Sequence, residues 1–142
     1  MHFRHRTVQF IVAVILPVLA MIGCDNPGTV PVAPTTPGVS TTESFSGSIS
    51  VNGAVTYQFT SSSRGTVTAT LTTVGPDATL VIGVSLGTWN GTSCQVLLAN
   101  DAAAQGATVL GTVSGVGNLC LRVYDVGKLT GPATYTVDVT HP

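Results

Sequence analysis

The stretch Val55-Thr56-Tyr57-Gln58-Phe59-Thr60 alternates an apolar with a polar side chain at every step. Because successive side chains of a β-strand point to opposite faces, this alternation predicts a strand with one buried face. The same period of two recurs outward from this stretch, around Phe45, Ile49 and Val51 and within 67–71, 80–86, 96–98, 109–113, 119–123 and 135–139. The chain is therefore predicted to be rich in short strands.

Turn signals separate these segments, among them Asn52-Gly53, Gly75-Pro76-Asp77 and Asn90-Gly91. Short strands with turns at such spacing are typical of antiparallel sandwiches. We expect residues 43–142 to form an all-β, jelly-roll-like antiparallel sandwich of seven or eight strands. Only 101–106, with three Ala between Asp101 and Gly106, favours one turn of helix. The expected inward residues are Val55, Tyr57, Phe59, Val67, Leu71, Ile82, Val84, Leu121, Val123, Tyr135 and Val137.

The composition of the chain limits its class. Of 142 residues, 44% are hydrophobic and 8% are charged, and the net charge is -1 with five Lys and Arg. The apolar fraction is too high for a disordered chain. A nucleic-acid partner is excluded, because so few cations cannot neutralise a phosphate backbone.

The amino terminus has the layout of an export signal. Two Arg lie within the first six residues, and an apolar run follows from Phe10 to Gly23 that is shorter than the ~20 residues of a membrane span. The junction Gly23-Cys24 resembles the bacterial lipobox, with Met21 where that motif usually has Leu. We expect residues 1–23 to be a lipoprotein signal peptide and Cys24 to be diacylated; an ordinary cleaved signal and an uncleaved anchor are the alternatives.

Residues 24–42 are interpreted as the lipidated Cys followed by a Pro- and Thr-rich tether. Four Pro lie between 25 and 42, without a periodic apolar face. Pro-rich segments stay extended, so this one would reach up to roughly 50 Å from the lipid surface. The protein is therefore expected to be exported and anchored by lipid to the bacterial cell envelope, facing the periplasm or the cell surface.

The cysteine count agrees with export. The chain has three Cys, and lipidation of Cys24 accounts for the odd one. Cys94 and Cys120 then form an even pair in an oxidising compartment, where we expect a disulfide. The strand pattern places Cys120 on the face opposite Leu121, so a bulge near Cys94 is needed, and 91–93 is a candidate place for it.

A family resemblance covers about residues 43–140. The residues that carry it are Phe45 to Gly53, 55–59, Cys120-Leu121-Arg122-Val123-Tyr124-Asp125 and Tyr135-Thr136-Val137, which resemble the bacterial pre-peptidase C-terminal domain. That resemblance implies a jelly-roll-like sandwich that is non-catalytic and assists secretion or binding. Some relatives bind calcium through an acidic cluster at the start of the domain, where this chain offers only Glu43.

Residues suited to catalysis or metal binding are scarce, and the chain is not expected to be an enzyme. His141 is the only His after the signal and is next to last, a position too loosely held for a general base. Two Cys without metal-ligand spacing cannot fill a zinc shell, so no metal or other cofactor is expected. For Asp125 we favour a turn residue that bonds to nearby amides over a calcium ligand.

Candidate ligand-binding residues are Trp89, Asn90 and Tyr124. Trp89 in Gly-Thr-Trp-Asn-Gly is suited to stacking on a sugar or holding a peptide, but we favour a cap over the end of the sandwich near Cys94. The leading hypothesis is a non-catalytic, lipid-anchored envelope protein with a structural, adhesion or secretion-assisting sandwich. The alternative is a lectin-like module that binds a glycan or peptide through the Trp89 loop. The expected partners are the membrane and an envelope protein or polysaccharide.

Overall fold

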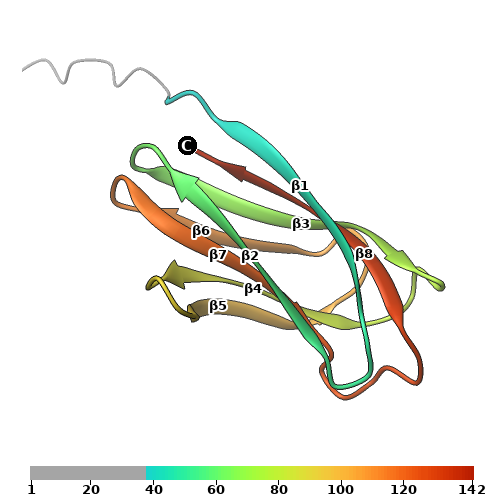
Figure 1. Cartoon of the computed structure of the whole chain (residues 1–142). Helices are drawn as coiled ribbons and strands as arrows, with labels where there is room; N and C mark the ends of the chain where they lie inside the picture. The colour runs from blue at the N-terminus through green and yellow to red at the C-terminus, as the bar shows by residue number, and fades with distance from the viewer. Residues whose placement is uncertain (1–37) are drawn as a thin grey trace, which may run out of the picture. The chain divides into compact units, whose positions relative to one another are not determined.

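The computed structural model describes residues 38–142. The signal peptide, Cys24 and the tether up to residue 37 lie outside the described residues. Eight strands form the domain, and β1 begins within the segment assigned to the tether (Figure 1). The strands are β1 (Thr41–Ile49), β2 (Ala54–Ser61), β3 (Gly65–Gly75), β4 (Ile82–Trp89), β5 (Cys94–Ala103), β6 (Thr108–Val113), β7 (Gly117–Tyr124) and β8 (Ala133–His141).

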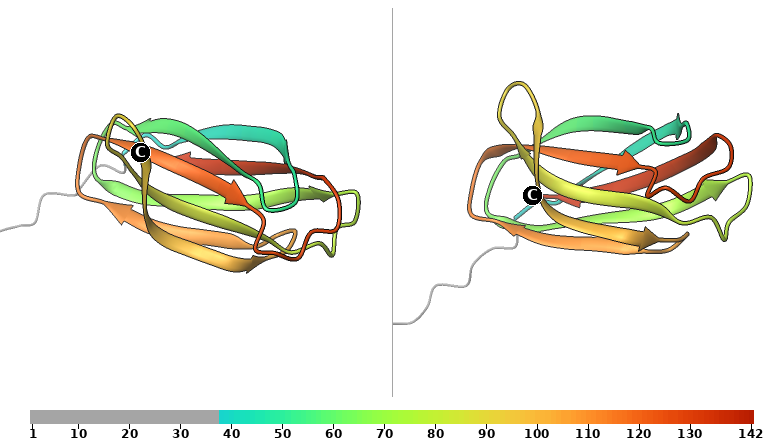
Figure 2. Two further views of the ribbon diagram at one scale, coloured as in Figure 1. Left: turned by 60° about the horizontal axis from the view of Figure 1, so that its bottom comes forward. Right: turned by 90° about the horizontal axis from the view of Figure 1, so that it is seen from below.

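The strands build two four-stranded antiparallel sheets that pack face to face. Sheet A has the order β1-β8-β3-β6 and sheet B has the order β2-β7-β4-β5. This is the strand order of a jelly roll, in which consecutive strands, except the β4–β5 hairpin, pass from one sheet to the other. The predicted antiparallel sandwich is thus confirmed, and in Figure 2 the two layers are seen from two further sides.

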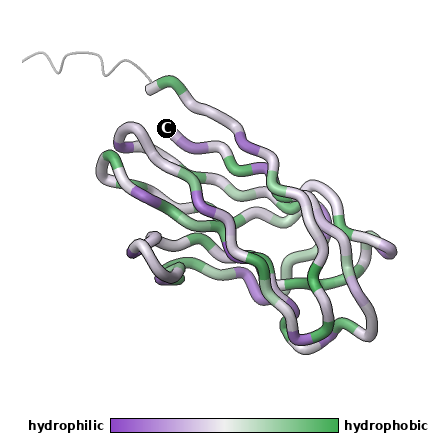
Figure 3. The backbone as a smooth tube through the Cα atoms, viewed as in Figure 1, coloured by the Kyte–Doolittle hydropathy of each residue, from purple (hydrophilic) through white to green (hydrophobic). Residues whose placement is uncertain are grey.

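The core lies between the two sheets and contains the residues that the alternation predicted to face inward. Phe59, Val67, Leu71, Ile82, Val84, Leu121, Val123, Tyr135 and Val137 are buried, and Val55 and Tyr57 are partly buried against them. Apolar and polar residues alternate along the strands in Figure 3. The Tyr57 hydroxyl lies 2.9 Å from that of Tyr135, so these rings also join the two sheets by a hydrogen bond.

Thr and Ser side chains line the outer face of sheet A, where they bond to one another. Neighbouring hydroxyls on β1 and β8 bond to each other, Thr42 to Thr140 at 2.8 Å and Ser46 to Thr136 at 3.0 Å. Hydroxyl pairs across antiparallel strands stabilise a sheet by a few tenths to about 1 kcal/mol each. This face thereby satisfies part of its own polar groups and needs no ligand to account for it.

The helical turn predicted over 101–106 is wrong. Asp101 to Ala103 complete β5, and Gln105 and Gly106 form a turn, with Gly106 at φ 89°. The side chain of Asn100 accepts a hydrogen bond from the amide of Ala102, and Ala103 pairs with Ile82 of β4. Strand pairing and burial of Ala103 therefore override the weak helical preference of three Ala.

Asp125 is a turn residue, in line with our interpretation. Its Oδ1 accepts hydrogen bonds from the amides of Gly127, Lys128 and Leu129, and its Oδ2 accepts one from Asn52. These bonds, that from Asn52 most of all, hold the pKa of Asp125 below its ordinary value. The carboxylate thus ties the loop after β7 to the β1–β2 turn.

The described residues include no helix able to cross a bilayer.

Candidate functional site

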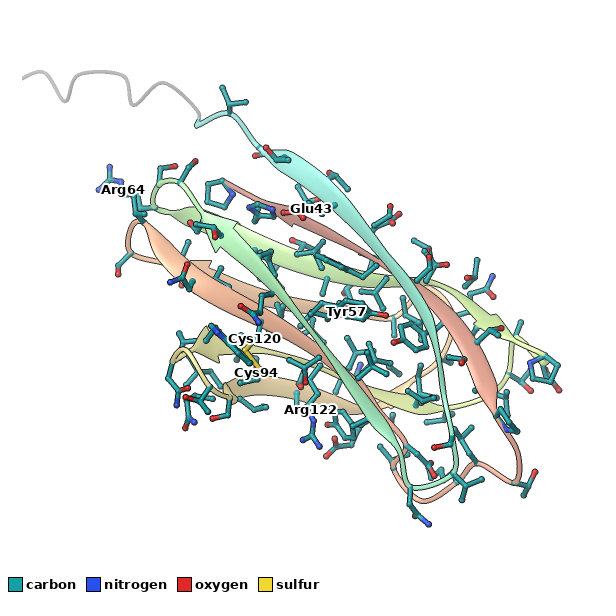
Figure 4. The ribbon with its side chains drawn as sticks, viewed as in Figure 1. Glu43, Tyr57, Arg64, Cys94, Cys120 and Arg122 are labelled. Atoms are coloured by element: carbon teal, nitrogen blue, oxygen red, sulfur yellow. A yellow bond between two sulfur atoms is a disulfide. The ribbon has the colours of Figure 1, made fainter. Side chains whose placement is uncertain are left out.

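The Cys94–Cys120 disulfide defines one end of the site (Figure 4), as predicted. The two Cα atoms lie 5.7 Å apart although Cys94 is on β5 and Cys120 on β7, strands that are separated by β4 in sheet B. The bond is made over Gly87 of β4, which pairs with Cys120. The backbone of Gln95 lies directly against Gly87, in the space that a side chain would fill. The start of β5 is therefore folded across the outer face of β4 and bonded to β7.

A bulge makes this crossing compatible with the strand pattern. Leu86 pairs with Leu98 but Gly87 pairs with Val96, so β5 has one extra residue, Leu97. The bulge expected at 91–93 thus lies after Cys94 rather than before it. The reason is that 90–93 close the β4–β5 hairpin, where the Asn90 side chain accepts hydrogen bonds from the amides of Thr92 and Ser93.

Beyond the disulfide, β5 leaves a group of apolar side chains in solvent. Val96 is 42% exposed, Leu97 69% and Leu98 40%, and Leu110 of β6 and Val116 of the following loop are 64% and 78% exposed. Scattered apolar residues on a surface are ordinary, but a contiguous group marks an interaction site. Three apolar residues in succession at 96–98 are the sequence signal for this group, and the period of two predicted a short strand there.

A cavity of about 350 Å³ lies beside these side chains, between the two sheets. We call it the edge cleft. Its lining includes Phe59, Val67, Leu86, Leu97, Val113 and Leu119. None of the described residues that line it carries a charge. The cleft is therefore suited to an uncharged, apolar group.

The cleft opens along the side of the sandwich where both sheets end. β5 is the outer strand of sheet B and β6 is the outer strand of sheet A. A second hollow lies between the same two strands and is lined by residues 98–102 of β5, which include the charged Asp101, and by 108–110 of β6. An outer strand presents unpaired backbone N–H and C=O groups, so two sets of such groups flank the opening.

The residues predicted to bind a ligand lie at two places. Trp89 and Asn90 belong to the β4–β5 hairpin, which stands out from the sandwich in Figure 2 (yellow). Tyr124 packs on Gly83, at the other end of β4. The structure therefore does not combine them in one site. Trp89 is half-buried beside Cys94, its partner in the strand register, and lies outside the core cluster.

The surroundings of Tyr124 leave its ring little freedom. One side of the ring lies against Gly83, and the guanidinium carbon of Arg122 is 5.3 Å from the ring centroid. The hydroxyl donates a hydrogen bond to Asp101 Oδ1. The pKa of Tyr124 is raised to about 12, first by burial and then by the hydrogen bond to Asp101 and the negative charge of that carboxylate. The positive charge of Arg122 lowers the pKa by a smaller amount. A sugar could stack on the ring only if Arg122 moved away.

His141 is not loosely held, in contrast to the expectation for a terminal residue. It ends β8 and is 4% exposed, with Nε2 2.9 Å from Glu43 Oε1 and its ring 5.0 Å from that of Phe59. The backbone oxygen of Pro142 accepts a hydrogen bond from the amide of Ser62, which ties down the chain end. His141 is thus buried and held by its neighbours, whereas the Glu43 side chain that it contacts is 42% exposed. Within residues 38–142, no three His, Cys, Asp or Glu side chains gather as metal ligands do.

The chain has little detectable similarity to known proteins. No protein-family model matches the chain, and no curated protein matches it significantly. Among solved structures, it is similar to the periplasmic inhibitor of g-type lysozyme, PliG, from Aeromonas hydrophila, with 14% identity and a TM-score of 0.45 over 70% of this chain and 84% of that chain. A likeness at this level transfers no function to this chain.

Proposed function

We propose that this chain is an exported, lipid-anchored and non-catalytic binding module of the bacterial cell envelope, which engages a protein partner at the edge cleft. The observation that carries the proposal is the group of exposed apolar side chains, Leu97 and Val116 above all, that line an uncharged cleft. Contiguous apolar surface in water is unfavourable by about 25 cal/mol per Å², so its retention points to a partner that covers it.

The placement in the envelope rests on the cysteines and the amino terminus. The Cys94–Cys120 disulfide fits an oxidising compartment, and the third Cys follows the apolar run of the signal. The resemblance to pre-peptidase C-terminal domains supports an accessory role in adhesion or secretion, and the jelly-roll strand order is compatible with it. A glycan site at Trp89 has weaker support, because Tyr124 lies at the other end of β4 with Arg122 over its ring.

Lipid anchoring predicts that the Cys24→Ser variant leaves the membrane. Diacylation plus an amide-linked chain gives stable attachment, whereas a single chain binds only marginally. In fractionated cells, the wild-type protein should remain with the membranes and the variant should move to the soluble fraction. Mass spectrometry of the wild-type protein should find Cys24 with its acyl chains as the first residue. An intact Met1, or another mature terminus, would contradict the anchor.

The binding role is tested in living cells of the source organism by placing a photo-crosslinking amino acid at Leu97. Illumination should join the protein to one defined envelope protein, identified by mass spectrometry. Val51, an apolar residue of the β1–β2 turn with 43% exposure, is the matched control position and should give no such adduct. Adducts from position 51 but not from 97 would place the binding surface elsewhere and refute the proposal.

A further inference from the structure

We infer that the edge cleft receives an extended, uncharged segment of a polypeptide, which adds as a strand to the free edge of β6 and inserts an apolar side chain between the sheets. This inference rests on the proposed function and specifies the form of the partner. It follows from three observations, which concern the edge of β6, the lining of the cleft and the occupants that the geometry disfavours.

The edge of β6 is unprotected against a further strand. Proteins commonly block outer strands with charges, Pro or bulges. β5 has bulges at two places along its pairing with β4, which disrupt its edge. β6 reads Thr-Val-Leu-Gly-Thr-Val, without charge or Pro, and it pairs with β3 in an uninterrupted register from Gly65–Val113 to Thr70–Thr108. Of the two strands that flank the cleft, β6 is therefore the better template for main-chain pairing.

The lining of the cleft selects what the added strand presents. Val109 and Val113 of β6 turn toward the core, while Gly111 between them has no side chain, and the end of the Leu98 side chain occupies the space beside it. A side chain of an added strand would enter here beside Leu97 by displacing the end of Leu98, a flexible side chain that is 40% exposed. Because none of the described lining residues is charged, a charged side chain there would lose its hydration without gaining a partner.

A second copy of this chain and a lipid chain fit the cleft less well. In a pair of sandwiches joined through β6, the inward side chains of the second copy, Val109 and Val113, already belong to its own core and cannot fill the first copy's cleft. An acyl chain would fill apolar space, but it cannot bond to the unpaired N–H and C=O groups of β6. A single extended peptide has side chains free on both faces and supplies both kinds of contact.

The inference is tested with synthetic peptides and the mature chain, residues 24–142, carrying Cys24→Ser. The probes are acetyl-Gly-Ser-Thr-X-Thr-X-Thr-Ser-Gly-amide, with X as Val, Leu or Phe, and a matched probe with X as Lys. At saturation, at least one apolar probe should slow hydrogen exchange of amides in 108–113 by about tenfold or more, the protection typical of newly paired strand amides. The Lys probe should slow none of them.

Two controls separate strand addition from simple apolar contact. Two further probes are N-methylated at every second backbone amide, one at the odd-numbered and one at the even-numbered residues. Only one of the two should fail to protect β6, because a strand bonds to its neighbour through alternate residues. Leu97→Asp and Val116→Asp should abolish binding of the apolar probe. Val51→Asp, the same kind of exposed apolar-to-acid change outside the cleft, should leave binding unchanged.

Each contrary result overturns the inference in a recognisable way. If both methylated probes protected β6 equally, the probe would make apolar contact without strand pairing. If palmitate displaced the probe while the β6 amides stayed protected, the cleft would be an acyl-chain site. Protection of β6 without any probe, together with a dimer in sedimentation, would mean self-association. If position 97 crosslinks to an envelope protein in cells but no probe protects β6, strand addition is wrong and the proposed function stands.

Discussion

Replacing both Cys94 and Cys120 by Ala should lower the free energy of unfolding of the domain by about 3.5 kcal/mol. The disulfide joins residues with a sequence separation of 26. In the chain-entropy model, the loss of stability equals the free energy of the conformational entropy that this bond removes from the unfolded chain. The disulfide also keeps the start of β5 across β4, since the cysteines lie on strands that are not neighbours. Urea unfolding of the oxidised protein and the double variant measures the loss.

The emission of Trp89, the single Trp of the chain, gives a local readout for the same variant. Trp89 pairs with Cys94 at the base of the β4–β5 hairpin, so release of β5 should change its fluorescence before global unfolding. A titration of the denatured, unreduced wild-type domain should find no free thiol at Cys94 or Cys120. A loss below about 1 kcal/mol would show that β5 keeps its path without the covalent bond.

Gly87→Ala should lower the free energy of unfolding by about 3 kcal/mol or more, at the upper end of the range for overpacking in a well-packed site. A Cβ atom on Gly87 would collide with the carbonyl oxygen of Gln95, which is backbone and cannot turn aside. Relief of this collision requires β5 to move off β4, away from Cys120. The variant should therefore also accumulate free thiols at Cys94 and Cys120, detectable by alkylation and mass spectrometry.

Gly117→Ala is the matched control. Gly117 begins β7 in the same sheet, but a Cβ there meets no atom within 4 Å, and its φ is not positive. Its stability should change by no more than about 0.5 kcal/mol, as expected for a surface substitution. If the two Ala variants were equally stable and equally oxidised, the crossing of β5 over Gly87 would be wrong.

Much of the fold could be predicted because it depends on local alternation. A period of two places Phe59, Leu121 and Val137 on one face of their strands wherever those strands lie, and each is buried. The role of Asp125 was also predictable, since its amide partners Gly127, Lys128 and Leu129 are two to four residues away. The disulfide followed from counting Cys in an exported chain.

The candidate site could not be predicted from alternation, because that pattern does not say where a sheet ends. The segment 96–98 was assigned to a strand, which is correct, but its apolar side chains are exposed because β5 is the outer strand of sheet B. Likewise, the end position of His141 indicated a loosely held residue. The pairing of β8 with β1 instead brings Glu43, 98 residues away in the sequence, into contact with it.

The sequence by itself determined the all-β class, a count of seven or eight strands, the inward face of most of them and the pairing of Cys94 with Cys120. The tertiary structure alone decided which strands are outermost, that β5 crosses β4 at Gly87, and that β5 and β6 flank an uncharged cleft. The physical reason is that side-chain alternation is set by neighbours along the chain. Strand order is set by contacts between residues far apart in sequence, whose free energy depends on the whole packed sandwich.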